Sequence, residues 1–204
     1  MLDATHIAFL QDQATVDWHA ASVASAAASH EAATTLDTFL LAHHRANFDL
    51  WHEEDKAREP DVPDSHIAQI KHTIDALNQR RNDLVETIDR MLLEAAGTQT
   101  ASAPLNSESP GLMIDRLSVL ALKLYHTEEE VHRLNASEAH HDKNRARLAL
   151  LREQRNDLAA CLDELWIQVQ SGTRRFKLYR QMKMYNDPDL NPAIYSHSTP
   201  GKSS

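Results

Sequence analysis

The sequence has few of the residues that interrupt helices and almost none that cross-link chains. Its 204 residues include only 4 glycines, 7 prolines and one cysteine, Cys161. A single cysteine excludes an internal disulfide and is typical of a reducing compartment, which predicts a cytoplasmic protein. With so little glycine and proline, the chain is dominated by strong helix formers. We therefore expect an all-α protein, and we expect Cys161 to be a packing residue.

Long apolar runs are missing as well. No stretch approaches the roughly 20 apolar residues that a membrane-spanning helix needs. The first residues, which include Asp3, lack the basic start and the apolar core of a secretory signal. These absences predict that the protein has no membrane span.

The charge is negative overall but unevenly distributed. The net charge is −9, yet residues 174–183 hold five cations and no acid. An acidic body argues against nucleic acid as a partner, because nucleic acids need a broad basic surface. A short basic segment can instead hold one phosphate group, or it can dock on the acidic body, and the sequence favours these two alternatives equally. The anion-binding candidates in this segment are Arg174, Arg175, Lys177, Arg180 and Lys183.

One short motif occurs twice. Arg81-Asn82-Asp83-Leu84 returns 74 residues later as Arg155-Asn156-Asp157-Leu158. At this offset, ten of the 43 positions in the range 50–92 are identical to their counterparts. Repetition at this length predicts two copies of one helical hairpin, arranged as an antiparallel bundle with pseudo-symmetry.

The spacing of apolar residues predicts where the helices lie. Apolar residues separated alternately by three and four positions, such as Ile67, Ile70, Ile74 and Leu77, lie on one face of a helix. They indicate one such apolar stripe, or seam, for each long helix. We also expect a short helix before residue 35, and Asp64 as an N-cap. The predicted helices span 35–58, 64–95, 111–134 and 138–170. They form a single domain, 1–192, made of hairpin one (35–96), a linker (97–110), hairpin two (111–171) and a basic arm (173–192), before a disordered tail (193–204).

Two arginines, Arg81 and Arg155, interrupt otherwise apolar seams. Buried charges are costly unless they are paired. One hypothesis is therefore that these arginines neutralise nearby carboxylates, with Asp115 the first choice and Asp83 and Asp157 as alternatives. The other hypothesis is that they bind a phosphate or carboxylate ligand together with Asn82 and Asn156, since arginine binds such groups through two hydrogen bonds.

Other polar residues suggest acid–base chemistry. His52 and Glu54 recur as His126 and Glu128, so each hairpin places a histidine near a carboxylate. These four residues are the catalytic candidates. However, each histidine directly follows an aromatic residue of the apolar seam, Trp51 or Tyr125. This position favours exposure of the histidine to solvent over a catalytic role.

Evidence for a metal site is weaker. Glu129-x-x-His132 has the spacing used in di-metal helical bundles, but such sites need the motif twice. The first hairpin has Arg58 where the second histidine would be. We therefore favour no metal and no cofactor, with Glu128, Glu129 and His132 as the weak candidates.

Several motifs together resemble the domain-of-unknown-function family numbered four-two-five-four, in order from about Ala4 to Pro192. They are Trp51-His52-x-Glu54-Asp55-x-Ala57-Arg58, Ile74-Asp75-x-Leu77-Asn78-Gln79-x-Arg81-Asn82-Asp83, Ile114-Asp115-Arg116-Leu117-Ser118, Lys123-Leu124-Tyr125-His126 and Tyr179-Arg180-Gln181-x-Lys183-Met184-Tyr185-Asn186-Asp187-Pro188. The resemblance implies a bacterial, cytosolic protein often encoded near glycosyltransferases of envelope-glycan synthesis. It supplies no catalytic residue.

Three functions remain open from the sequence. The first is binding of a phosphorylated sugar or nucleotide-sugar in the service of lipopolysaccharide or exopolysaccharide synthesis. The second is a non-enzymatic adaptor that docks a glycosyltransferase, and the third is an acid–base or metal-assisted enzyme that uses the Glu/His residues. A homodimer is compatible with all three.

Overall fold

The computed structural model describes residues 2–24, 34–60, 63–180 and 189–191. Within these residues the chain forms five helices, α1 (Ala4–Ala24), α2 (Thr35–Lys56), α3 (Asp64–Ala96), α4 (Pro110–His132) and α5 (Glu138–Gln170), and no strand. The protein is thus an all-α helical bundle, as the composition predicts. None of the helices in the described ranges is long and apolar enough to cross a membrane.

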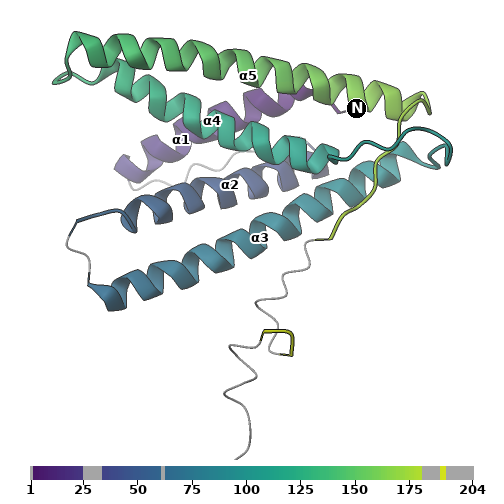
Figure 1. The fold of residues 1–204 in the computed structure, drawn as a ribbon, viewed down its shortest axis with the longest axis horizontal. Helices are drawn as coiled ribbons and strands as arrows, with labels where there is room; N and C mark the ends of the chain where they lie inside the picture. The colour runs from purple at the N-terminus through teal and green to yellow at the C-terminus, as the bar shows by residue number, and fades with distance from the viewer. Residues whose placement is uncertain (1, 25–33, 61–62, 181–188, 192–204) are drawn as a thin grey trace, which may run out of the picture.

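The long helices are arranged as two antiparallel hairpins (Figure 1). One hairpin pairs α2 with α3, and the other pairs α4 with α5. Their helices have matching lengths of 22 and 33 residues in the first and 23 and 33 in the second. The helix boundaries lie within two residues of those predicted, while common descent of the two hairpins from one repeat stays a prediction.

Local sequence explains where these helices begin and end. Thr34 and Asp37 form a capping box at the start of α2, and the side chains of Ser109 and Ser137 cap α4 and α5. The expected cap Asp64 is wrong: the cap position of α3 is Pro63, which makes no side-chain cap hydrogen bond, and Asp64 is the first helical residue. A proline there is compatible with a helix start because it fixes an extended entry without needing an amide donor.

Helix α1 differs from the short leading helix expected from the sequence. It is 21 residues long and contacts α4, α2 and α5. Its start is held by the Asp163 carboxylate of α5, which accepts a hydrogen bond from the Ala4 amide at 2.9 Å. An acceptor at a helix N-terminus satisfies an otherwise unpaired donor. Helix α1 is therefore an integral member of the bundle.

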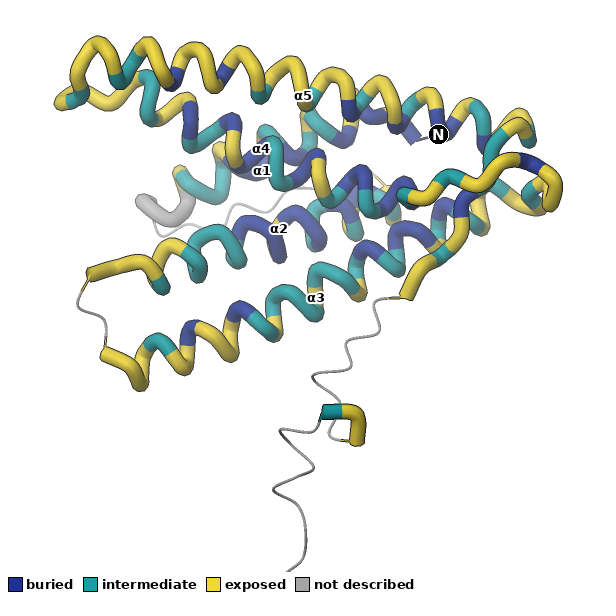
Figure 2. Tube along the Cα trace, viewed as in Figure 1, coloured by how far each residue is buried: buried dark blue, intermediate teal, exposed yellow. Residues whose placement is uncertain are grey.

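Buried residues are concentrated toward the end of the bundle where α1 begins (Figure 2), and this end is apolar. The apolar core gathers the first turns of α1, α2 and α4 with the last turns of α3 and α5. Ile7, Leu40, Ile88, Leu117 and Leu162 are among its almost fully buried members. Toward the other, more polar end, α1, α2 and α4 bury polar side chains among the apolar ones, namely Gln11, Thr15, His43, His44, Asn47, Ser118 and Thr127.

The basic arm is extended and docks on the linker. Leu105 and Arg175 form an isolated parallel β-bridge, and the Asn106 amide donates to the Arg175 carbonyl at 2.7 Å. Phe176 is 1% exposed and belongs to the apolar core. The arm therefore closes the apolar end of the bundle. Predictions for residues 181–188 and for the tail 193–204 lie outside the described residues.

Candidate functional site

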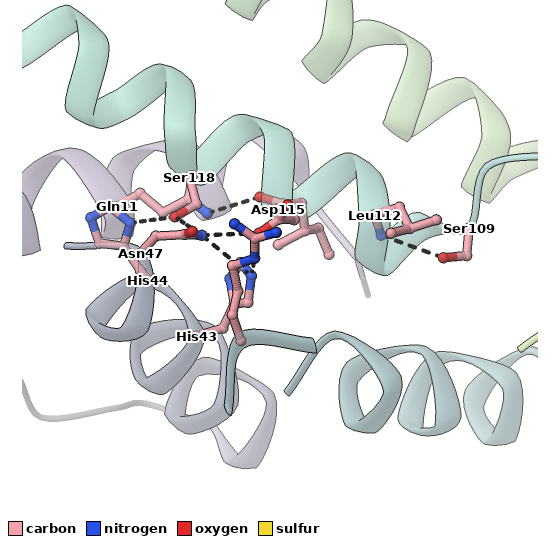
Figure 3. A network of polar contacts seen from close by, with 10 residues as sticks. Gln11, His43, His44, Asn47, Ser109, Leu112, Asp115 and Ser118 are labelled. Carbon is pink, nitrogen blue, oxygen red and sulfur yellow. Dashed lines mark hydrogen bonds and ion pairs between the residues drawn. The ribbon is translucent and has the colours of Figure 1, made fainter. Parts of the chain in front are cut away.

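A buried polar network lies between α2, α3 and α4 and is centred on Asp115 (Figure 3). One carboxylate oxygen of Asp115 lies 2.9 Å from Nε2 of His43 and 3.0 Å from Nδ2 of Asn47. The same oxygen is 3.5 Å from Nε of Arg81. His43 has no partner for Nδ1 among the described residues. Its proton therefore belongs on Nε2, from which it donates to Asp115.

This arrangement keeps Asp115 ionised. Burial alone would raise the pKa of Asp115, but the hydrogen bond and charge of His43, the charge of Arg81 and the hydrogen bond of Asn47 together lower it below its usual value. Asp115 is thus the counter-ion of Arg81. His43 and Asn47 also donate hydrogen bonds to this carboxylate, so Arg81 is only one of three groups that stabilise the charge of Asp115.

The network continues from Asn47 toward α1. Asn47 also donates to Ser118 Oγ at 3.0 Å, and Ser118 hydrogen bonds with His44 Nδ1 at 2.7 Å. His44 Nε2 lies 2.8 Å from Thr15 Oγ1. Thr15 uses its only hydroxyl proton on the Gln11 carbonyl, 2.8 Å away. His44 must then donate to Thr15, and Ser118 donates to His44, so every proton in this chain has an acceptor.

A cavity of about 380 Å³ opens beside this network, between α2, α3 and α4. Leu50, Val119 and Leu122 form its apolar wall, and Arg81 and Asn47 reach it from the network. Its other lining residues are Trp51, Glu54, Asp55 and Arg58. Glu54 forms an ion pair with Arg58 at 3.0 Å and not with Arg81. The cavity therefore combines an aromatic face, two arginines and two carboxylates.

A second polar cluster joins α1, α2 and α4. His19, His52 and His126 each place one ring nitrogen within 4.8 Å of a nitrogen of the other two. The expectation that His52 and His126 face solvent is wrong, because both are only partly exposed and pack against His19. Glu129 joins this cluster through His126, at 2.8 Å.

The pKa of His19 is lowered from its ordinary value. Burial, which disfavours the imidazolium, is the largest cause, and the nearby His126 and His52 act in the same direction. The hydrogen bond to the Thr15 carbonyl and the charge of Glu129 oppose the shift. The surroundings of His19 therefore favour its neutral form.

The second arginine of the seams lies elsewhere. Arg155 contacts Asp12 of α1 at 2.5 Å, and with Glu128 it lines a different cavity, of about 220 Å³. Glu128 is exposed and pairs with Arg152 at 3.3 Å. None of the cavities found among the described residues is lined by both Arg81 and Arg155.

The remaining repeat residues point away from the network. Asp83 is exposed and accepts from Gln79, while Asp157 is exposed and lines a cavity of about 660 Å³ between α4 and α5. Asn82 is partly exposed and Asn156 fully exposed. His132 is exposed as well, so Glu129 and His132 do not meet as a metal pair. Cys161 is also exposed, contrary to the packing role expected for it.

The cations of the arm do not converge on either cluster. Arg174 lies 3.2 Å from the side-chain oxygen of Gln168, and Arg175 donates to the Ala103 carbonyl at 2.8 Å. Lys177 and Arg180 are exposed, and Lys183 lies outside the described residues. Within its described part, the arm is therefore a docked segment.

Sequence reasoning missed His19, His44, Thr15 and Ser118. Three of them have no counterpart among the motifs, and His19 and Thr15 lie in a helix that the sequence predicts to be short. The one available signal was the pair His44 and Ser118, which are separated by the repeat offset of 74 residues.

The comparison with protein families agrees with the motifs. The model of the family described as "Protein of unknown function (DUF4254)" matches residues 37–178, and the chain belongs to this family. No curated protein and no solved structure matches the chain.

Proposed function

We propose that this protein binds a small phosphorylated ligand, of the sugar phosphate or nucleotide-sugar type, in the cavity between α2, α3 and α4. The observation that carries the proposal is the state of Arg81. Its Nε is buried, and within the described residues it has no hydrogen-bond partner, although it lies 3.5 Å from Asp115. An arginine held at a cavity wall with unused donors is suited to an anionic ligand.

The surroundings of Arg81 support this assignment. Asp115 accepts hydrogen bonds from His43 and Asn47, so the guanidinium of Arg81 can turn its remaining donors to the cavity. The network also fixes the position of Arg81, because Asp115 is itself held by two other helix-borne side chains. Such preorganisation lowers the cost of ordering a binding group when the ligand arrives.

The other lining residues suit a sugar. Trp51 offers an apolar aromatic face, while Glu54 and Asp55 offer carboxylate oxygens that accept from hydroxyl groups. The volume of about 380 Å³ lies in the range of small-molecule sites, roughly 300–1,000 Å³. A larger hollow of about 660 Å³ between α4 and α5 is less suited to a sugar, because no aromatic residue in the described ranges lines it.

We further propose that the ligand belongs to cell-envelope glycan synthesis in a bacterial cytoplasm. This part rests on the family resemblance, which implies that the protein is encoded near glycosyltransferases. The phosphorylated sugars that such enzymes use match the chemistry of the cavity.

Calorimetric titration of the purified protein with glucose 1-phosphate, UDP-glucose and inorganic phosphate tests the proposal. We expect a sugar-containing ligand to bind, and Arg81→Gln to weaken its binding by at least about tenfold, equal to about 1.4 kcal/mol. The matched control is Arg80→Gln, which changes the exposed neighbour of Arg81 and should leave the affinity unchanged.

The results also discriminate between parts of the proposal. If inorganic phosphate and glucose 1-phosphate bound with equal affinity, the cavity would recognise the phosphate alone, and the sugar would no longer be part of the proposal. The assignment of this cavity would be overturned if none of the three ligands bound. It would also be overturned if Arg81→Gln and Arg80→Gln lost the same amount of affinity.

A further inference from the structure

We propose that His19, His52 and His126 form a binding site for a divalent transition metal ion, with Zn²⁺ as the first choice. The proposal is independent of the anion cavity and rests on different residues. The three histidines come from α1, α2 and α4, which meet at the polar end of the bundle. No metal is needed to bring them together, since they are already in contact.

The spacing of the rings suits a shared ion. Their centroids lie 5.2 Å apart for His19 and His52, 5.0 Å for His19 and His126, and 5.9 Å for His52 and His126. In a tetrahedral zinc site with Zn–N distances of about 2.1 Å, ligand nitrogens are about 3.4 Å apart. Since the nitrogens here lie within 4.8 Å of one another, each pair has to close by at most about 1.4 Å. Small rotations of the rings provide such a movement.

Hydrogen bonds place the ring proton of all three histidines on the same atom, Nδ1. His19 Nδ1 lies 2.7 Å from the Thr15 carbonyl, and His52 Nδ1 lies 2.8 Å from the Phe48 carbonyl. A carbonyl oxygen can only accept, so these Nδ1 atoms carry the protons and Nε2 is left as the ligand atom. His126 repeats the pattern with the Glu129 carboxylate, 2.8 Å from Nδ1.

This pattern is the one found behind metal ligands. Histidines that bind metals donate their other ring proton to a carbonyl or carboxylate, which fixes the tautomer and raises the basicity of the ligand nitrogen. Here all three rings have such an acceptor. The Nε2 of His126 is also buried and has no hydrogen-bond partner among the described residues. A metal ion would give this nitrogen the partner that it lacks.

Aromatic packing keeps the rings in place. Tyr125 stacks on His19 with centroids 4.1 Å apart, and Trp51 stacks on His126 at 4.9 Å. Phe48 packs against His52 at 4.4 Å. These contacts restrict the rotamers of the three ligands before any ion binds, so the site is largely preorganised.

Three nitrogen ligands determine what the site can do. Neutral imidazoles suit zinc, copper, nickel and iron better than magnesium or calcium, which take oxygen ligands. Three protein ligands also leave one position of a tetrahedral ion for water or a substrate. The site is therefore of the open kind, and His126 also lines a cavity of about 460 Å³.

Zinc titration of the tag-free, full-length protein after EDTA treatment and dialysis tests the proposal. We expect one equivalent of Zn²⁺ to bind and to raise the melting temperature, because an ion that binds only the native state stabilises it. Co²⁺ in place of Zn²⁺ should give the visible absorption of a nitrogen-coordinated ion. His52→Gln and His126→Gln should each abolish this stoichiometric binding.

His132→Gln is the matched control. It removes an exposed histidine from the same helix as His126, and it should bind zinc like the wild type. Glu129→Gln keeps all three rings but replaces the carboxylate behind His126, so its affinity should fall by about 10- to 100-fold. Circular dichroism of the metal-free variants shows whether each of them folds. If a histidine variant does not fold, Glu129→Gln still tests the proposal, because it keeps all three rings.

Three results would overturn the proposal. One is binding of less than one equivalent by the wild type, and another is undiminished binding by His126→Gln. The third is equal affinity of Glu129→Gln and the wild type. In each case the three rings would serve only as packing between the helices.

Discussion

The carboxylate of Asp89 on α3 accepts a hydrogen bond from the Gly111 amide, 2.6 Å away in the first turn of α4. Its other oxygen accepts from the hydroxyl of Ser109, the N-cap of α4. One buried side chain therefore joins the end of the first hairpin to the start of the second.

Asp89 should make stability depend on pH. Burial is the main reason that its pKa is raised to about 6 from 3.8, with Glu86 acting in the same direction against the hydrogen bonds of Ser109 and Gly111. The folded protein then holds a proton between about pH 4 and 6 that the unfolded chain releases, so the free energy of unfolding falls by about 3 kcal/mol as pH rises through this window. Asp89→Asn should remove this fall, as measured by urea denaturation at several pH values.

The exposed Asp83 on the same helix supplies the control. Asp83→Asn should keep the pH dependence of the wild type. If the difference in stability between Asp89→Asn and the wild type stays constant from pH 4 to 7, the shifted pKa of Asp89 is wrong.

Gly111→Ala should destabilise the protein. A Cβ atom at Gly111 would lie 2.8 Å from the carboxylate of Asp89 and 2.9 Å from the Val85 carbonyl. Overpacking of this kind costs about 1–3 kcal/mol, which should exceed the gain in helix propensity from alanine. Thermal unfolding measures the loss, and the loss should be smaller in an Asp89→Ala background. Equal losses in both backgrounds would mean that Asp89 is not the side chain that is displaced.

Asn47→Leu should disrupt the network around Asp115. The substitution removes the donor that Asp115 and Ser118 share, and it leaves buried acceptors short of a partner. We expect a loss of about 2–4 kcal/mol in the free energy of unfolding. Asn78→Leu is the comparison, because Asn78 hydrogen bonds only to the Ile74 carbonyl of its own helix among the described residues and should cost less than about 1 kcal/mol. Similar losses in the two variants would contradict the role given to Asn47.

Phe176→Ala should release the arm. The ring is 1% exposed in the apolar core, and truncation of a buried phenylalanine costs about 3–5 kcal/mol. Limited trypsin digestion should then cut after Lys177 faster than in the wild type. Tyr179→Ala, at a residue that is 43% exposed, should change neither stability nor cleavage noticeably. Unchanged cleavage of the Phe176 variant would show that the linker contacts alone hold the arm.

Much of the architecture could be predicted from the sequence because it depends on local signals. The apolar spacing of α3 and α5 and the caps at Thr34 and Ser109 act within a few residues of where they lie. The pairing of Arg81 with Asp115 also follows from burial, since a seam arginine needs a carboxylate. Predicting the helices needs no knowledge of how the hairpins pack, whereas the choice of Asp115 over Asp83 and Asp157 depends on the contact between α3 and α4.

The candidate sites depend on packing, and the sequence predicts them poorly. Arg155 meets Asp12 because α1 crosses α5, which no spacing within α5 indicates. The Ala/Ser-rich end of α1 carries a weak periodic signal, so His19 could not be assigned to the side of His52 and His126. The sequence also predicted that His52 and His126 are exposed, because each follows an aromatic residue of the seam. In the structure, α1 packs against α2 and α4 at this point and covers both histidines in part.

Two of the contacts between α2 and α4 join positions separated by the repeat offset of 74 residues. His44 meets Ser118, 74 residues later, and His52 meets His126. At the second pair both positions carry the same residue, so α2 and α4 supply two histidines there. Helix α1 adds Thr15 to the first pair and His19 to the second. The third histidine thus comes from the described helix that lies outside the two hairpins, and the cluster of three depends on how α1 packs against α2 and α4.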